Sequence, residues 1–245
     1  MTETLPLADV LDAFGDAINF IFSPQQSEFT EEGEVGGPGE VLDHLATHLR
    51  VSGAAFALAI GVAFPVGLVL GHRGRGEGLA IAVGNAGRAV PELALIAFMV
   101  AFVGVGFLNV TIALAVLGLP PILTNTFVGI SQVDRNAVEA AKGMGMTGAE
   151  VLRRVELPLA VPTIFAGLRT AAINIIATAT IAPLGGVLTL GDFILFQNTF
   201  GPEGVLAGAI LVALLAITVE LLLAGLQAAL TPRGLRLQRA AASQT

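Results

Sequence analysis

The stretch VSGAAFALAIGVAFPVGLVLG, residues 51–71, contains no charged side chain and is long enough to cross a bilayer as one helix. The hydrocarbon core is about 30 Å thick, so a spanning helix needs about 20 mostly apolar residues. Further stretches of this kind are 109–131, without charge, 159–182, with Arg169 alone, and 204–230, with Glu220 alone. The sequence therefore predicts an all-helical polytopic membrane protein.

A fifth span is harder to assign, because two charges and Pro91 interrupt the apolar segment 79–108. Proline lacks a backbone donor and disfavours helix at the residue before it. We expect a span at 91–107, preceded by a short helix at 79–89 that lies at or near the membrane surface. The prediction is five transmembrane helices in a membrane domain at 46–231.

The composition supports this class and excludes others. Of the 245 residues, 54% are hydrophobic and 13% charged, and the mean hydropathy is +0.82. The chain has no Cys, Trp or Tyr, which excludes disulfides and thiolate metal sites. The net charge of -7 is uneven: residues 1–50 carry ten acids and one base, and the rest carries nine acids and eleven bases. No dense basic face for nucleic acid is expected.

The basic residues predict the orientation. Ten of the twelve lie in two loops and the C-terminal tail: Arg73, Arg75, Arg88, Arg135, Lys142, Arg153, Arg154, Arg233, Arg236 and Arg239. Because basic residues accumulate on the cytoplasmic side, we expect the N-terminus outside, the C-terminus inside and a cytoplasmic basic tail at 232–245.

Residues 1–45 are expected to lie outside the cell. Apolar residues at three-and-four spacing predict an amphipathic helix on the outer surface within residues 1–22: Leu7, Val10, Leu11, Phe14, Ile18 and Ile21. The Glu-, Gly- and Pro-rich segment 23–39 is expected to be a flexible linker. The alternative is a disordered extracellular tail.

The longest polar segment inside the membrane domain is VDRNAVEAAKGMGMTGAEVLRRVELPLAVP, residues 133–162. It predicts two short helices joined by a turn: Asp134 can cap the first, and Thr147 with Glu150 has capping-box spacing for the second. The second helix is expected to end before Pro158. Small residues in this loop, 133–158, allow a partner surface to approach closely, and Met144 offers an adaptable apolar contact.

This loop resembles the EAA loop in the membrane subunits of bacterial ABC importers, whose pattern is EAA, three residues, Gly, nine residues, Ile, one residue, Leu-Pro. The only departure is Val155 in place of Ile. The resemblance implies that the loop docks on a cytoplasmic ATPase and transmits its movement to the spans. The residues implied are Glu139, Ala140, Ala141, Met144, Gly145, Val155, Leu157 and Pro158.

The resemblance extends over roughly residues 45–230. In this range the chain is similar to the permeases of osmoprotectant importers, which carry glycine betaine, choline, carnitine or proline-type solutes. Segments 48–76, 88–98, 117–130 and 168–186 share it. It implies a type I ABC importer permease (MetI-like) fold in the cytoplasmic membrane of a prokaryote. The implied partners are two ATPase subunits, a second permease subunit, identical or a sister chain, and an extracytoplasmic solute-binding protein.

The chain is not expected to be an enzyme or to bind a cofactor itself. A P-loop needs Gly-Lys-Ser/Thr, whereas the only lysine, Lys142, lies between Ala141 and Gly143. ATP and Mg²⁺ therefore belong to the partner ATPase. Since Trp and Tyr faces for cation–π recognition are missing, selectivity is expected mainly in the solute-binding protein. Three phenylalanines of an outer loop either line the entrance or pack: Phe193, Phe196 and Phe200.

Ionisable side chains inside spans are costly and point to function. Arg169 and Glu220 are expected at similar depth and form either a structural ion pair or a gate that breaks during transport. Glu92 is a competing partner for Arg169, and Arg88 with Glu92 has the four-residue spacing of a local pair.

Polar residues in the spans make either helix-to-helix hydrogen bonds or the lining of the path. The path candidates are Asn125, Asn174 and Thr178. His44 and His48 have the spacing of a helical metal pair but no evident third ligand, so no metal site is predicted.

Three alternatives stay open. The first is that the chain carries another small solute, such as an amino acid, within the same transporter class. An ATP-independent secondary transporter would require matching repeats, and none is visible in the sequence. An intramembrane enzyme would require a catalytic constellation at depth, whereas all three His lie outside the predicted spans.

Overall fold

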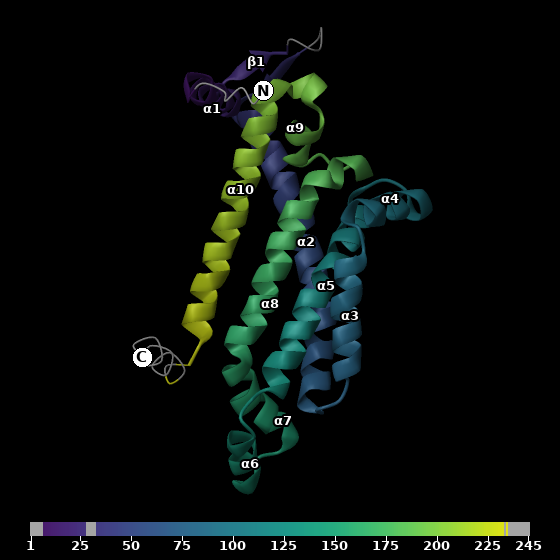
Figure 1. Ribbon diagram of the computed structural model, residues 1–245, viewed down its shortest axis with the longest axis vertical. Coiled ribbons are helices and arrows are strands. Elements are labelled where there is room, and N and C mark those ends of the chain that lie inside the picture. Colours follow the sequence, from purple (N-terminus) through teal and green to yellow (C-terminus); the bar gives the residue numbers. More distant parts are fainter. Residues whose placement is uncertain (1–6, 28–32, 233, 235–245) are drawn as a thin grey trace, which may run out of the picture. The chain divides into compact units, whose positions relative to one another are not determined.

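The computed structural model describes residues 7–27, 33–232 and 234, apart from the side chains of Leu7, Ala8 and Arg88. Most of the predicted tail at 232–245 therefore lies outside the described residues. The elements (Figure 1) are α1 (Leu7–Phe22), β1 (Pro24–Gln26), β2 (Glu34–Gly36), α2 (Gly37–His72), α3 (Glu77–Ala89), α4 (Glu92–Val103), α5 (Phe107–Ser131), α6 (Arg135–Gly143), α7 (Gly148–Val151), a π-helical turn (Leu152–Glu156), α8 (Leu157–Thr178), a 3-10 turn (Ala179–Gly185), α9 (Gly191–Leu195) and α10 (Gln197–Leu230).

Four helices are long and apolar enough to cross a membrane: Gly37–His72, Phe107–Ser131, Gly148–Gly185 and Gln197–Leu230. A fifth crossing requires α3 and α4 together. The prediction of a separate span at 91–107 was wrong, because α4 has 12 residues and spans only about 18 Å. The break at Pro91 was correct, since Val90 has an extended backbone there.

The chain divides into two compact units. The first contains Met1–Ala54, Glu92–Leu114 and Ile176–Ile217, and the second contains Ala55–Pro91, Ala115–Ile175 and Thr218–Thr245.

The first unit places the N-terminal segment against α9 and the start of α10. Its buried cluster consists of Ala17, Phe20, Val41, Leu190, Phe193, Phe200 and Ala207. Between α1 and α2 the chain is not only a linker: β1 and β2 form an antiparallel hairpin in which Gln25 pairs with Val35. The amphipathic helix is confirmed, and the alternative of a disordered tail is wrong for its described part.

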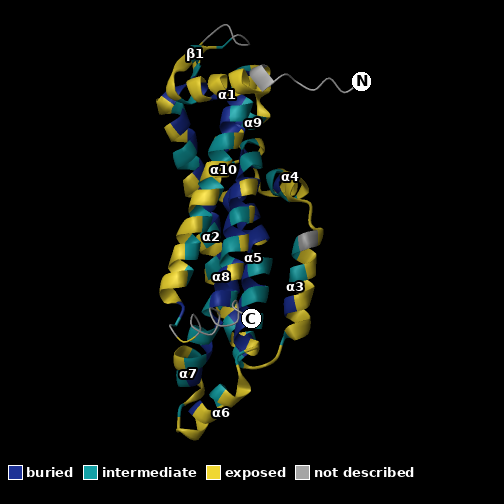
Figure 2. Ribbon diagram, turned by 60° about the vertical axis from the view of Figure 1, so that its left-hand side comes forward, coloured by how far each residue is buried: buried dark blue, intermediate teal, exposed yellow. Residues whose placement is uncertain are grey.

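The burial of α1 differs from the prediction. Phe20 and Ala17 are fully buried, whereas most of the predicted apolar stripe, including Leu11, Phe14 and Ile18, is exposed (Figure 2). Phe20 therefore fixes the helix to the first unit and leaves the stripe available to another apolar environment. Its placement on a membrane surface stays a prediction.

The second unit is held by close packing of α2 on α5. Buried small residues recur at every fourth position of α2: Ala55, Ala59, Ala63, Gly67 and Gly71. A side chain at Gly67 would meet Cβ of Thr126 at 2.7 Å, and one at Gly71 would meet Cβ of Ile130 at 2.8 Å. Small residues at such spacing let membrane helices approach closely, because van der Waals packing replaces the hydrophobic effect in lipid.

We expect Gly67→Val to lower the thermal stability of the purified chain in detergent, because the new side chain clashes with α5. Overpacking of this kind costs about 1–3 kcal/mol. Gly61→Val is the matched control, since an added side chain at Gly61 on the same helix meets nothing within 4 Å. Equal melting temperatures of the two variants would show that this contact is unimportant.

The helix α3 was predicted to lie at the membrane surface, but it packs along α5 instead. Gly87 leaves room for Pro120, and Thr124 Oγ1 donates a hydrogen bond of 3.3 Å to the backbone oxygen of Ala80. Gly84 is also close, since a side chain there would meet Thr124 Oγ1 at 3.1 Å. The glycines of α3 are therefore packing positions, and α3 belongs with the membrane helices of the second unit.

Candidate functional site

The loop between α5 and α8 has the local structure that its sequence predicts. Asp134 Oδ1 accepts a hydrogen bond of 2.9 Å from Asn136 N and caps α6. Thr147 and Glu150 form the predicted capping box of α7. Gly145 makes the turn between the two helices with φ of +86°, a conformation that favours glycine.

The exposed surface of this loop contains a carboxylate, small residues and a thioether. Glu139, Ala140, Met144 and Gly145 are exposed, and Met144 is 72% exposed. Ala141, in contrast, is buried. It was predicted to contribute to the open surface, but its side chain is buried within this chain, and a contact with an ATPase stays a prediction.

The second helix of the loop does not end before Pro158, as predicted, but continues into α8. Leu157 N donates to Leu152 O, five residues back, so a π-helical turn precedes Pro158. Such turns absorb local irregularity without ending a helix. As a result, the segment Gly148–Gly185 runs from the loop into a membrane span.

Of the C-terminal motif residues, Val155 and Leu157 are partly buried. Leu157 packs on the buried cluster of Ile130, Ala160 and Ile164. Leu157 and Pro158 also line an apolar hollow of about 360 Å³. They therefore pack at the base of the loop, and their part in docking stays a prediction.

Sequence reasoning missed Glu156, the unspecified position of the motif. Its carboxylate is buried and lies 2.6 Å from Nδ1 of His72 at the end of α2. The two residues are 84 positions apart, so no local pattern could have revealed the contact. It ties the base of the loop to α2.

The predicted intramembrane pair is present in the second unit. Arg169 on α8 forms an ion pair with Glu220 on α10, and its Nη1 lies 3.3 Å from Oε1 of Gln227. Glu92 does not compete, since its Oε2 accepts a hydrogen bond of 2.8 Å from Thr178 in the first unit. The predicted pairing of Arg88 lies outside the described residues.

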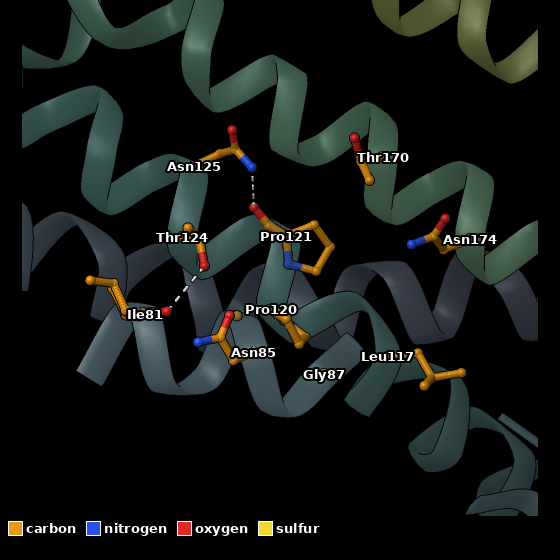
Figure 3. A pocket seen from close by; sticks show the side chains of 12 residues that line it. Ile81, Asn85, Gly87, Leu117, Pro120, Pro121, Thr124, Asn125, Thr170 and Asn174 are labelled. Atoms are coloured by element: carbon orange, nitrogen blue, oxygen red, sulfur yellow. Dashed lines mark hydrogen bonds between the residues drawn. The ribbon is translucent and has the colours of Figure 1, made fainter. Parts of the chain in front are cut away.

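A cavity of about 370 Å³, lined by apolar residues and by five polar ones, lies between α3, α5 and α8 (Figure 3). It brings together two predicted path residues, Asn125 and Asn174, with three residues that sequence reasoning missed: Asn85, Thr124 and Thr170. Thr178, the third predicted path residue, is buried against Glu92 and does not line this cavity.

The aromatic residues after α8 pack rather than form an open entrance. Phe193 and Phe200 are buried, and their rings meet edge to face at 4.9 Å. Phe20 packs on both rings, with centroid distances of 5.4 and 6.3 Å. Only Phe196 of the predicted three is exposed.

The two histidines near the start of α2, His44 and His48, contact residues of the same unit. His44 Nε2 lies 3.5 Å from Asp192 Oδ2, and His48 Nε2 lies 3.1 Å from the backbone oxygen of Ile176. Among the described residues, no group of three or more His, Cys, Asp or Glu side chains could hold a metal ion.

Burial raises the pKa of Asp192, while the neighbouring His44 opposes this shift. Because the folded-state pKa lies above the unfolded one, the carboxyl's contribution to stability is fully present below about pH 3.9 and is lost as the pH rises through the folded pKa. We expect Asp192→Asn to unfold at a higher temperature than wild type near pH 7, with the difference shrinking toward pH 4. Thermal unfolding in detergent measures this. Asp43→Asn, at an exposed position, is the control and is expected to shift the unfolding temperature equally at all pH values. A difference between Asp192→Asn and wild type that does not change with pH would contradict the prediction.

The fold and the site together define a membrane component of a transporter: apolar spans joined by a capped, exposed polar loop that is continuous with one span. The family of binding-protein-dependent transport system inner membrane components matches residues 63–233. The chain belongs to this family, and the predicted inner-membrane location is confirmed.

The chain is similar to known permeases over most of their length. It is 41% identical to the glycine betaine/carnitine/choline transport system permease protein OpuCB of Bacillus subtilis, covering 81% of this chain and 92% of that one. It is 42% identical to the carnitine transport permease protein OpuCB of Listeria monocytogenes, covering 77% and 87%. The osmoprotectant import permease protein OsmY of Salmonella typhimurium is 35% identical, covering 72% and 75%.

Solved structures confirm the fold. The inward-facing MetNI methionine ABC transporter matches with a TM-score of 0.67 at 19% identity, covering 79% of this chain and 97% of that one. An amino acid ABC transporter matches with a TM-score of 0.59 at 20% identity, covering 78% and 92%. The fold is that of a type I ABC importer permease. Family membership makes the chain a transport permease subunit, which is consistent with the expectation that it is not an enzyme.

Proposed function

We propose that this chain is the membrane subunit of an osmoprotectant importer and carries small solutes of the glycine betaine, choline, carnitine or proline type into the cell. The observation that carries the proposal is 41% identity to a glycine betaine/carnitine/choline permease over 92% of its length. The amino-acid alternative has only structural neighbours under 25% identical in its favour, and these bear on fold alone.

The proposed assembly contains two cytoplasmic ATPase subunits, a second permease chain and an extracytoplasmic solute-binding protein. ATP and Mg²⁺ bind to the ATPase subunits. Movement of these subunits is transmitted to the spans through the exposed surface of α6 and the continuous helix from α7 into α8. The exposed Glu139 and Met144 support docking there. The lack of Trp and Tyr supports placing most selectivity on the solute-binding protein.

The test is to tag the chain in its native membrane, extract it in mild detergent, and reconstitute the co-purified assembly with its binding protein into liposomes. We expect an ATPase to co-purify and labelled glycine betaine to accumulate only with ATP. Recovery of one permease type indicates a homodimer, and two types indicate a heterodimer. Absence of an ATPase under conditions that preserve a known ABC importer, or uptake of amino acids in place of betaine, would overturn the proposal.

A further inference from the structure

The cavity between α3, α5 and α8 is lined by polar side chains that lie within otherwise apolar helices. Asn85 on α3 and Thr170 and Asn174 on α8 are exposed, although they lie within membrane helices. An amide that faces lipid leaves its donor and acceptor unsatisfied, so such residues face water, a solute or another helix. Exposed amides that also line a cavity therefore indicate a polar occupant of that space, which is water, a solute or a helix of the second permease subunit.

The α5 residues that line this cavity include two oxygen acceptors without a helical or side-chain donor in the usual place, the carbonyl of Leu117 and Oδ1 of Asn125. Pro120 and Pro121 have no N–H, so the carbonyl groups four residues earlier lose their usual helical donor. One of these belongs to Leu117, which lines the cavity together with Pro121. Asn125 Nδ2 donates to the backbone oxygen of Pro121 at 2.9 Å (Figure 3), which leaves Oδ1 of Asn125 as an acceptor.

The described lining residues include no ionisable side chain and no aromatic ring. Neither a carboxylate nor an aromatic cage is therefore available among them to hold a cation. Carbonyl and amide oxygens can take this role, as they do where backbone carbonyls replace the hydration shell of an ion, and polarised C–H groups also make weak bonds to oxygen. A volume of about 370 Å³ is in the range of small-ligand pockets.

We infer that this cavity is a transit site for the N-methylated ammonium group of the solute, held by main-chain and amide oxygens in place of aromatic rings or a counter-charge. The inference rests on the proposed function and names the residues of this chain that meet the cargo. The amides of Asn85 and Asn174 supply donors for the carboxylate or hydroxyl at the other end of the solute. Because the described lining residues carry no fixed charge that would trap the cation, weak binding and ready release are expected.

The chain contains no cysteine, so one introduced thiol is unique on it. We would label Asn174→Cys and Thr170→Cys variants of the assembled transporter in lipid nanodiscs with N-ethylmaleimide, and follow modification of this chain by mass spectrometry. Asn198→Cys, at an exposed position of α10 outside the cavity, is the control. Thr170→Cys is close in size to the native residue and guards against a folding defect at Asn174.

Glycine betaine and choline are expected to slow labelling at both cavity positions, by about tenfold at about ten times their Kd, and to leave Asn198→Cys unchanged. The uncharged carbon analogue of choline, 3,3-dimethyl-1-butanol, should protect less. Equal protection by this analogue would overturn ammonium recognition, and no protection by betaine in a transporter that still imports it would overturn the site. If wild-type transporter does not import betaine at all, the proposed function fails instead.

Discussion

Glu139→Lys is expected to leave the chain inserted and assembled in the membrane but to reduce ATP-driven uptake by at least about tenfold, because it reverses the charge on the exposed face of α6. If an ATPase binds to the exposed face of α6, a reversed charge there weakens docking and uncouples ATP hydrolysis from transport. Uptake and ATP turnover of the same reconstituted assembly, measured in parallel, give the coupling ratio directly.

A second variant tests the shape of the same surface. Gly145→Leu adds bulk at the exposed turn and also places a side-chain residue at φ of +86°, which is strained for residues other than glycine. The same loss of coupling is expected. Asp43→Lys, an acid reversed at an exposed position of α2, is the matched control. Normal coupling in both loop variants would remove the docking role from α6.

The spans and the loop were predictable because lipid imposes strict rules. Every backbone group must be satisfied inside the bilayer, so uncharged stretches such as 109–131 have few options besides helix. The caps of the loop were also predictable, since Asp134 and Thr147 act on backbone groups only two or three residues away. Signals of this kind are local, and a single sequence contains them in full.

The errors arose where tertiary contacts override a local rule. Pro158 usually signals a helix end, but the π-helical turn before it preserves continuity into α8. The position of α3 was missed although Gly84 and Gly87 gave a usable signal, since small residues let membrane helices approach closely. The bond between His72 and Glu156 had no signal, because the residues are distant in the chain.

The candidate cavity was predictable only in part. Asn125 and Asn174 stood out because an amide within an apolar span needs a reason. Asn85 was hidden, since the helix that carries it was expected at the surface. Thr178 does not line this cavity, because its hydroxyl donates to Glu92 of another helix. Which polar residues share one cavity depends on the rotation of each helix about its axis, and a hydrophobic stretch that is apolar all round does not encode this rotation.

Arg169→Glu is expected to reduce uptake to less than about a tenth, and adding Glu220→Arg is expected to restore a large part of it. In the single variant two carboxylates face each other across α8 and α10, and an unpaired charge near the centre of a span costs about 3 kcal/mol. The exchanged pair recovers the attraction, with Gln227 still within reach as a hydrogen-bond partner. Glu220→Arg alone completes the cycle, so the coupling between the two positions is measured directly.

The same set of variants separates a structural pair from a gate. Because α8 continues into the loop helix without a break, movement of the loop would act on Arg169 and strain its bond to Glu220. If the pair is structural, the single variants lose melting temperature in detergent together with uptake. If it is a gate that opens in each cycle, they keep their melting temperature, and ATP turnover becomes independent of solute. Failure of the exchanged pair to recover either quantity would show that Arg169 and Glu220 act separately.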